Sequence, residues 1–177
     1  MKQNKNLIYN NPKQLLMSSK IVLVGKAAAG KDFFRKRMMD KGFTFGVSCT
    51  TRLKRIKDNE VDGKDYHFKS DKEFDVLVEA GEFVEYQSFN GWRYGITKNE
   101  FDNSDVMIMN AEAVKLLPSE YAKKCFIIYL DIPLETRIAR ITERNDIHDN
   151  VMRRVNDDEK QYLNFSQFDC KITNSDF

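Results

Sequence analysis

The stretch Gly25-Lys26-Ala27-Ala28-Ala29-Gly30-Lys31-Asp32 decides the fold. It matches the phosphate-binding loop G-x-x-x-x-G-K-[ST] at every defined position except the last, where Asp32 replaces serine or threonine. The glycines allow a tight turn whose N–H groups point into one concavity, and Lys31 supplies a positive charge for phosphates. The missing hydroxyl is the group that ordinarily holds Mg²⁺ in such loops. The loop therefore predicts nucleotide binding with an altered metal site.

The residues on either side of the loop have the pattern that a phosphate-binding loop requires. Lys20–Gly25 is a short β-branched run that predicts a buried strand, and Phe33–Asp40 has a helical pattern closed by Gly42. A strand that leads through a glycine-containing loop into a helix is the context in which this motif binds phosphate. The alternative is an ordinary glycine-containing turn, which this context disfavours.

Alternating strand and helix patterns along the rest of the chain predict an α/β fold with a parallel, doubly wound sheet. Asn90-Gly91 signals a hairpin, for which we expect a connection longer than two residues, and this hairpin belongs to an inserted lobe. Ser70-x-x-Glu73 is a capping box that opens a helix ending near Gly81. Other strands are expected at 43–51, 83–87, 93–95, 105–109, 125–131 and 168–173, and other helices at 111–117, 133–145 and 150–164.

The composition is that of a single globular domain. The chain has 177 residues, of which 41% are hydrophobic and 32% charged, and a net charge of +2 that argues against nucleic-acid or membrane partners. Its three cysteines are far apart and have no metal-ligand spacing, which indicates free thiols in a reducing compartment. No apolar run is long enough for a membrane span. These features predict a cytoplasmic protein. We also expect residues 1–19 to form a loose extension.

A second motif points to a phosphate monoester. Arg52 and Arg55 follow Ser48-Cys49-Thr50-Thr51, and Tyr66 comes shortly afterwards. Two guanidinium groups can bind phosphate oxygens bidentately, and a phenol adds a neutral donor. The alternative is an ordinary solvated basic loop over Arg52–Lys57.

These motifs closely resemble those of the guanylate kinase family. The family signature S-x-T-T-R-x-x-R followed by E-x-x-G-x-D-Y-x-F starts here at Ser48 and Glu60, with a gap about two residues longer than usual. Glu82-Phe83-Val84-Glu85-Tyr86 and Tyr94-Gly95 also match. The resemblance extends from Lys20 to Asn174. It implies a P-loop kinase with a core at 20–47, 97–136 and 155–177, a small mixed β-lobe for nucleoside monophosphate at 48–96, and a short helical lid at 137–154.

The resemblance implies an acceptor site for GMP. Ser48 and Glu85 would read the base, since a carboxylate accepts from both the N1–H and the N2 amino group of guanine, and adenine lacks that donor pair. The chain departs from the family pattern at two positions. Ile96 replaces a serine or threonine, and Ile108 replaces the first acid of a D-x-D motif whose second position is Asn110. The residues implied in the acceptor site are Ser48, Arg52, Arg55, Glu60, Tyr66, Glu85, Tyr94 and Asn110.

The donor side is implied by the loop and by arginines near the C-terminus. The residues Gly25–Asp32 would hold ATP, and Asn174 would lie near the donor base. Arg137, Arg140 and Arg144 share one helix face, and Arg153 and Arg154 follow on the next helix. The resemblance assigns the lid role to Arg140, Arg144 and one of the later pair, taken as Arg154, so that the catalytic set is Lys31, Arg52, Arg140, Arg144 and Arg154. The alternative is an exposed helix whose arginines pair with Glu135 and Glu143.

The metal is expected as Mg²⁺ that arrives with ATP. A protein need only orient such an ion, often through a water molecule. We expect the Asp32 carboxylate to do this in place of the absent hydroxyl and of the acid missing at Ile108. In the competing interpretation Asp32 caps the helix.

These patterns lead to one functional hypothesis and two alternatives. The hypothesis is an ATP-dependent kinase that converts GMP or dGMP to the diphosphate. One alternative is a relative acting on another nucleoside monophosphate or on a sugar phosphate. The other is a non-catalytic guanylate-kinase-like binding module.

Overall fold

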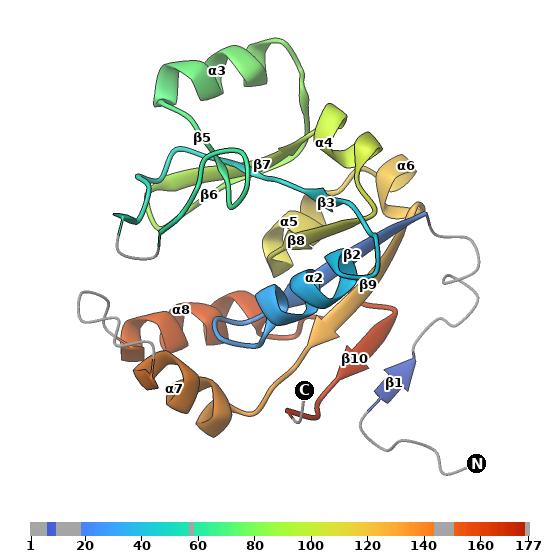
Figure 1. Cartoon of the computed structure of the whole chain (residues 1–177), viewed down its shortest axis with the longest axis vertical. Helices are drawn as coiled ribbons and strands as arrows, with labels where there is room; N and C mark the ends of the chain where they lie inside the picture. The colour runs from blue at the N-terminus through green and yellow to red at the C-terminus, as the bar shows by residue number, and fades with distance from the viewer. Residues whose placement is uncertain (1–6, 10–18, 57–58, 144–150, 176–177) are drawn as a thin grey trace.

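A mostly parallel sheet forms the core of the protein. The structure, a computed structural model, describes residues 7–9, 19–56, 59–143 and 151–175. Within these residues the larger sheet has the strand order β1-β10-β9-β2-β8-β3, and every neighbouring pair is parallel except β1 with β10 (Figure 1). Its strands are β1 (Leu7–Tyr9), β2 (Lys20–Gly25), β3 (Phe45–Gly46), β8 (Val106–Met109), β9 (Cys125–Leu130) and β10 (Cys170–Ile172).

Helices connect the core strands as the alternating pattern predicts. Two short helices lie outside the expected helix ranges: α4 begins after Thr97, a residue type that favours helix caps and whose side chain accepts from the Glu100 N–H, and α6 follows Pro118. Both are too short for their periodicity to show in the sequence. The helices are α2 (Lys31–Met39), α4 (Lys98–Asn103), α5 (Ala111–Leu116), α6 (Ser119–Ala122), α7 (Leu134–Glu143) and α8 (Val151–Tyr162).

A second, smaller sheet lies above the core sheet in Figure 1, together with helix α3. Its order in the described residues is β5-β4-β7-β6, with both parallel and antiparallel pairs. Helix α3 (Asp71–Glu79) begins with the expected capping box between Ser70 and Glu73. The strands are β4 (Cys49–Thr50), β5 (His67–Phe68), β6 (Phe83–Phe89) and β7 (Trp92–Thr97).

The single strand expected at 43–51 is wrong, because the chain passes there from one sheet to the other. Phe45–Gly46 pairs with β8 in the core, and Cys49–Thr50 pairs with β7 in the small sheet. Gly46 permits the crossing, since a Cβ added there would lie 2.5 Å from Ser104 Oγ. The hairpin connection is also shorter than expected. Phe89 pairs with Trp92, so only Asn90 and Gly91 turn, with φ values of 51° and 81° that suit a tight hairpin.

The N-terminal segment is not wholly a loose extension. Leu7–Tyr9 forms β1, antiparallel to β10 at the edge of the core sheet. Three residues are too few to show a period in the sequence, whereas an open sheet edge offers main-chain partners to any short extended segment.

The phosphate loop takes a left-handed turn at two positions. Gly30 is the N-cap of α2 with φ 97°, which glycine adopts without strain. Ala28 has φ 57°, in a region where its Cβ approaches the following carbonyl oxygen. An alanine therefore stores strain in the middle of the loop.

We predict that Ala28→Gly stabilises the protein by about 0.5–1 kcal/mol, because release from the left-handed penalty outweighs the larger unfolded-state entropy of glycine. Ala80→Gly is the matched control: Ala80 is exposed and has φ −75°, so the same change there should destabilise by a similar amount. Urea unfolding measures the change in the free energy of unfolding for each variant. A destabilised A28G would contradict the strain at Ala28.

Candidate active site

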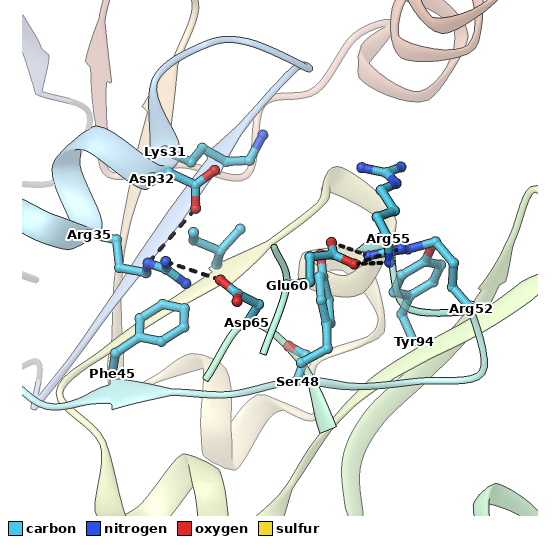
Figure 2. Close-up of a pocket in the computed structure, with 12 residues that line it drawn as sticks. Lys31, Asp32, Arg35, Phe45, Ser48, Arg52, Arg55, Glu60, Asp65 and Tyr94 are labelled. Carbon is cyan, nitrogen blue, oxygen red and sulfur yellow. Dashed lines mark hydrogen bonds and ion pairs between the residues drawn. The ribbon is translucent and has the colours of Figure 1, made fainter. Parts of the chain in front are cut away.

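Two adjoining cavities open between the core sheet and the small sheet. The first, here called the arginine cavity, is lined by Arg35, Arg52 and Arg55 (Figure 2). The second, the Glu85 cavity, is lined by Glu85, Gln87 and Asn110. Lys31, Ser48, Tyr66, Tyr94 and Ile108 line both cavities. The structure therefore brings the loop lysine and all the predicted acceptor residues to one place.

Arg52 is held in position by Glu60. Its Nη1 and Nη2 donate to the two carboxylate oxygens of Glu60 at 3.1 and 2.6 Å, and only 6% of Arg52 is exposed. Glu60 also accepts the N–H of Arg55 at 2.7 Å. Burial raises the pKa of Glu60, but the hydrogen bonds from Arg52 and from the Arg55 N–H outweigh it and the pKa is lowered. Glu60 thus remains ionised and orients an arginine that faces the cavity.

Aromatic rings complete the wall around Arg52. Its guanidinium lies 5.3 Å from the centre of the Tyr66 ring, and the Tyr66 and Tyr94 ring centres are 6.1 Å apart. Burial raises the pKa of Tyr66, which keeps the phenol protonated and able to donate. Arg55 is exposed and lines the cavity from the same loop. The set supplies cations and phenols suited to a phosphate monoester.

The Glu85 cavity contains a buried carboxylate with an unused oxygen. Only 8% of Glu85 is exposed, and its Oε2 has no hydrogen-bond partner among the described residues. Burial raises the pKa of Glu85 to about 7, and the Ile96 N–H partly offsets that rise. A buried carboxylate that no cation pairs with is costly unless a ligand supplies N–H donors.

The two isoleucine departures have different consequences. The Ile96 side chain packs in the hydrophobic core, so its N–H and not its side chain serves the site. Ile108 lines both cavities and places an apolar surface where an acid is usual. Asn110 caps α5, since its Oδ1 accepts the Ala113 N–H at 2.8 Å.

Helix α8 supports the phosphate loop. Asp158 accepts the Ala27 N–H at 2.7 Å, and the Tyr162 hydroxyl donates to the Gly25 carbonyl at 2.9 Å. Burial raises the pKa of Asp158. Lys31 Nζ donates to the carbonyls of Gly25 and Lys26 at 2.5 and 3.0 Å, so it folds back on its own loop. Helix α8 and Lys31 therefore both hydrogen-bond to the main chain of the loop.

The arginines of α7 divide into two roles. Arg140 donates to the carbonyls of Ala28 and Ser175, at 3.2 and 3.1 Å, which links the loop to the chain beside Asn174. Arg137 is 1% exposed and pairs with Glu159 at 3.0 Å, so it is a structural residue. Arg144 lies outside the described residues, and Arg154 lies on α8 with an undescribed side chain.

Asp32 does not cap α2, because the N-cap is Gly30 and no side-chain capping bond is formed. Its side chain is 63% exposed at the mouth of the arginine cavity, 3.8 Å from Arg35 (Figure 2). In the described part of the chain, no group of three His, Cys, Asp or Glu side chains is placed to hold a metal ion. The exposed Asp32 carboxylate would suit an ion that arrives bound to a nucleotide and needs one carboxylate from the protein.

Sequence reasoning missed three residues in this region. Arg35 lies between Asp32 and Asp65 and stacks on Phe45, with its guanidinium 4.8 Å from the ring centre (Figure 2). Its spacing of four from Lys31 could have revealed it. Gln87, two residues after Glu85, shares its strand face. Asp158 gave no signal, because its contact with the loop joins segments far apart in the chain.

We predict that Glu85→Gln gains stability relative to the parent protein as the pH rises. The folded-state pKa of Glu85, about 7, exceeds its unfolded value of 4.5. The contribution of the acid is therefore present below pH 4.5 and is lost as the pH rises through 7. The difference in unfolding free energy between the variant and the parent should move by about 2 kcal/mol in the variant's favour between pH 5 and pH 8. A pH-independent difference would contradict the raised pKa.

Comparisons with known proteins identify the family of this chain. The family model described as guanylate kinase matches residues 17–177. A guanylate kinase of Enterococcus faecalis is 44% identical over 78 residues, which are 42% of this chain and 37% of that protein. The chain thus matches little more than a third of that relative's length. A crystal structure of guanylate kinase from Anaplasma phagocytophilum shares the fold, with a TM-score of 0.66, 20% identity, and coverage of 90% of this chain and 78% of that one. The family match spans nearly the whole sequence, and the chain belongs to the guanylate kinase family.

Proposed function

We propose that this protein transfers the γ-phosphoryl group of ATP to GMP or dGMP. The observation that carries the proposal is the unpartnered Oε2 of buried Glu85, in a cavity that adjoins both the arginine cavity and Lys31. The base edge of guanine offers N1–H and N2–H donors side by side, which a carboxylate accepts together. Adenine would leave this carboxylate unpaired.

The acceptor phosphate would occupy the arginine cavity. Arg52 and Arg55 would bind its oxygens, with Tyr66 and Tyr94 as neutral donors, and Glu60 would act by holding Arg52. Ser48 and Asn110 line the Glu85 cavity, which supports contacts with the nucleoside. The two cavities share walls, so one nucleotide could fill both.

The donor triphosphate would occupy the loop Gly25–Asp32. Its N–H groups and Lys31 would hold the phosphates once Lys31 exchanges its main-chain carbonyl partners for phosphate oxygens. Arg140 is tied to the loop at Ala28, and Arg144 and Arg154 are proposed as further donor-side cations. Phosphoryl transfer needs alignment and charge neutralisation more than covalent help, and these groups supply both.

Mg²⁺ carried by ATP would neutralise phosphate charge, and Asp32 is the carboxylate proposed to meet it. The chain has the loop lysine and an arginine beside the ATP site. Their presence argues against a non-catalytic binding module, which needs no ATP site.

We also propose a cytoplasmic location. Cys49, Cys125 and Cys170 are free and buried, which suits a reducing compartment. None of the helices in the described part of the chain has the length and apolar character of a membrane span.

The proposal is tested by ADP release in a coupled assay with ATP, Mg²⁺ and a panel of acceptors: GMP, dGMP, AMP, CMP, dTMP and ribose bisphosphate. We expect turnover with GMP and dGMP at least 100-fold above AMP in kcat/KM, because AMP leaves Glu85 unpaired. Preference for another acceptor would contradict the guanine assignment and identify that acceptor as the substrate. Equal, background-level rates across the panel would rule out a kinase.

We predict that Asp32→Asn raises the Mg²⁺ concentration needed for half-maximal ATP binding by about three- to tenfold, since an amide neither carries charge nor orients coordinated water as a carboxylate does. ATP binding is followed by calorimetry, and binding without Mg²⁺ should not weaken. Asp40→Asn, at the exposed opposite end of α2, is the matched control. An unchanged Mg²⁺ requirement in the Asp32 variant would leave Asp32 without a metal role.

A further inference from the structure

Gln87 is a second buried polar residue in the Glu85 cavity. It lies two residues after Glu85 on β6, and both side chains line the cavity although their neighbours Tyr86 and Ser88 are exposed. Only 8% of Gln87 is exposed, and its Oε1 has no hydrogen-bond partner among the described residues. Two unpartnered buried oxygens, Glu85 Oε2 and Gln87 Oε1, therefore belong to one cavity.

The orientation of the Gln87 amide follows from a chain of hydrogen bonds. Asn110 Oδ1 accepts the main-chain N–H of Ala113, so that atom is an oxygen and an acceptor. The Gln87 atom that faces it at 2.5 Å must then be the donor Nε2. The other amide atom, which has no partner, is consequently Oε1. The cap of α5 thus determines that Gln87 presents an acceptor.

A ligand that satisfies both oxygens must offer several N–H donors on one edge. Guanine has three such hydrogens, one on N1 and two on its 2-amino group. Adenine and cytosine each place a ring acceptor beside their amino group, and thymine has a single ring N–H. Among these bases, guanine alone can satisfy a carboxylate bidentately and still have one N–H for a further acceptor.

We propose that Gln87 is a specificity-determining residue that accepts the second hydrogen of the guanine 2-amino group, with Asn110 as the residue that positions it. The inference rests on the proposed function, since it assigns a contact within the acceptor site. Gln87 thereby distinguishes guanine from hypoxanthine, which has a hydrogen in place of the 2-amino group. Glu85 accepts N1–H from both bases and loses one of its two hydrogen bonds with hypoxanthine, so Gln87 adds a second contact to the distinction that Glu85 makes.

A purely structural role for Gln87 would give a different pattern of nucleotide binding when Gln87 is replaced. The bond from Gln87 to Asn110 joins β6 to α5 and could serve only to fix the cavity wall. In that case the loss of Gln87 would weaken every purine nucleotide alike. A base-reading role affects only nucleotides that carry the 2-amino group.

The test compares GMP with inosine 5′-monophosphate (IMP) in the parent protein and in Gln87→Met. Methionine preserves length and volume, and Asn110 retains its bond from Ala113, so no buried acceptor is orphaned by the change. We expect the KM for GMP to rise about tenfold with little change in kcat, and the KM for IMP not to rise. Ser88→Ala, on the exposed face of the same strand, is the matched control and should leave both values unchanged.

Direct binding of both nucleotides, measured by calorimetry, accompanies the kinetics, and thermal unfolding checks that Q87M is folded. An equal loss for GMP and IMP would overturn the inference and indicate a structural role. GMP turnover with an unaltered GMP-to-IMP ratio in Q87M would overturn it as well, while the proposed function stood. If the parent protein neither binds nor phosphorylates GMP, the proposed function itself fails.

Discussion

Strand β2 lies between β8 and β9, and its residues Val22–Val24 are completely buried. Parallel pairing on both sides places the carboxyl ends of these strands at one edge of the sheet. Gly25 begins the phosphate loop at that edge, and Asn110 follows β8 there. The Cβ of any larger residue at position 25 would lie 2.9 Å from the Leu130 carbonyl oxygen, so the loop must leave the sheet through a glycine. The phosphate loop and Asn110 are positioned from this edge, and the small sheet supplies the opposite wall with Glu85 and Gln87.

Charges in the site are stabilised in contrasting ways. Arg52 and Glu60 neutralise each other in a bidentate pair, which holds the guanidinium ready for an anion. In the part of the chain that the structure describes, no cation pairs with Glu85, and its carboxylate is only partly compensated by the Ile96 N–H. Desolvation without compensation lowers stability in the free protein and is offset when a ligand supplies donors. In the proposed function, the unsatisfied buried oxygens of the acceptor site would select the base.

Residue patterns predicted most of the core but not the transitions between its parts. The strand at Lys20–Gly25 and the capping box at Ser70 follow from local chemistry, and both are confirmed. The split of 43–51 between two sheets could not be predicted, because the β-period continues while the hydrogen-bond partner changes. Likewise, Glu85 was found through its motif, whereas the role of Asp158 depends on a contact with Ala27 across 131 positions. Local periodicity contains no information on such pairs.

Proton release on GMP binding tests the central claim most directly, namely that a buried, partly protonated Glu85 selects guanine by accepting its N–H groups. With a pKa of about 7 in the free protein, roughly three quarters of Glu85 is protonated at pH 6.5. Calorimetry in two buffers of different ionisation enthalpy counts the protons exchanged by the parent protein and by E85Q. The parent should release about 0.7 proton more per GMP than the variant. Equal proton release from both proteins would contradict the claim.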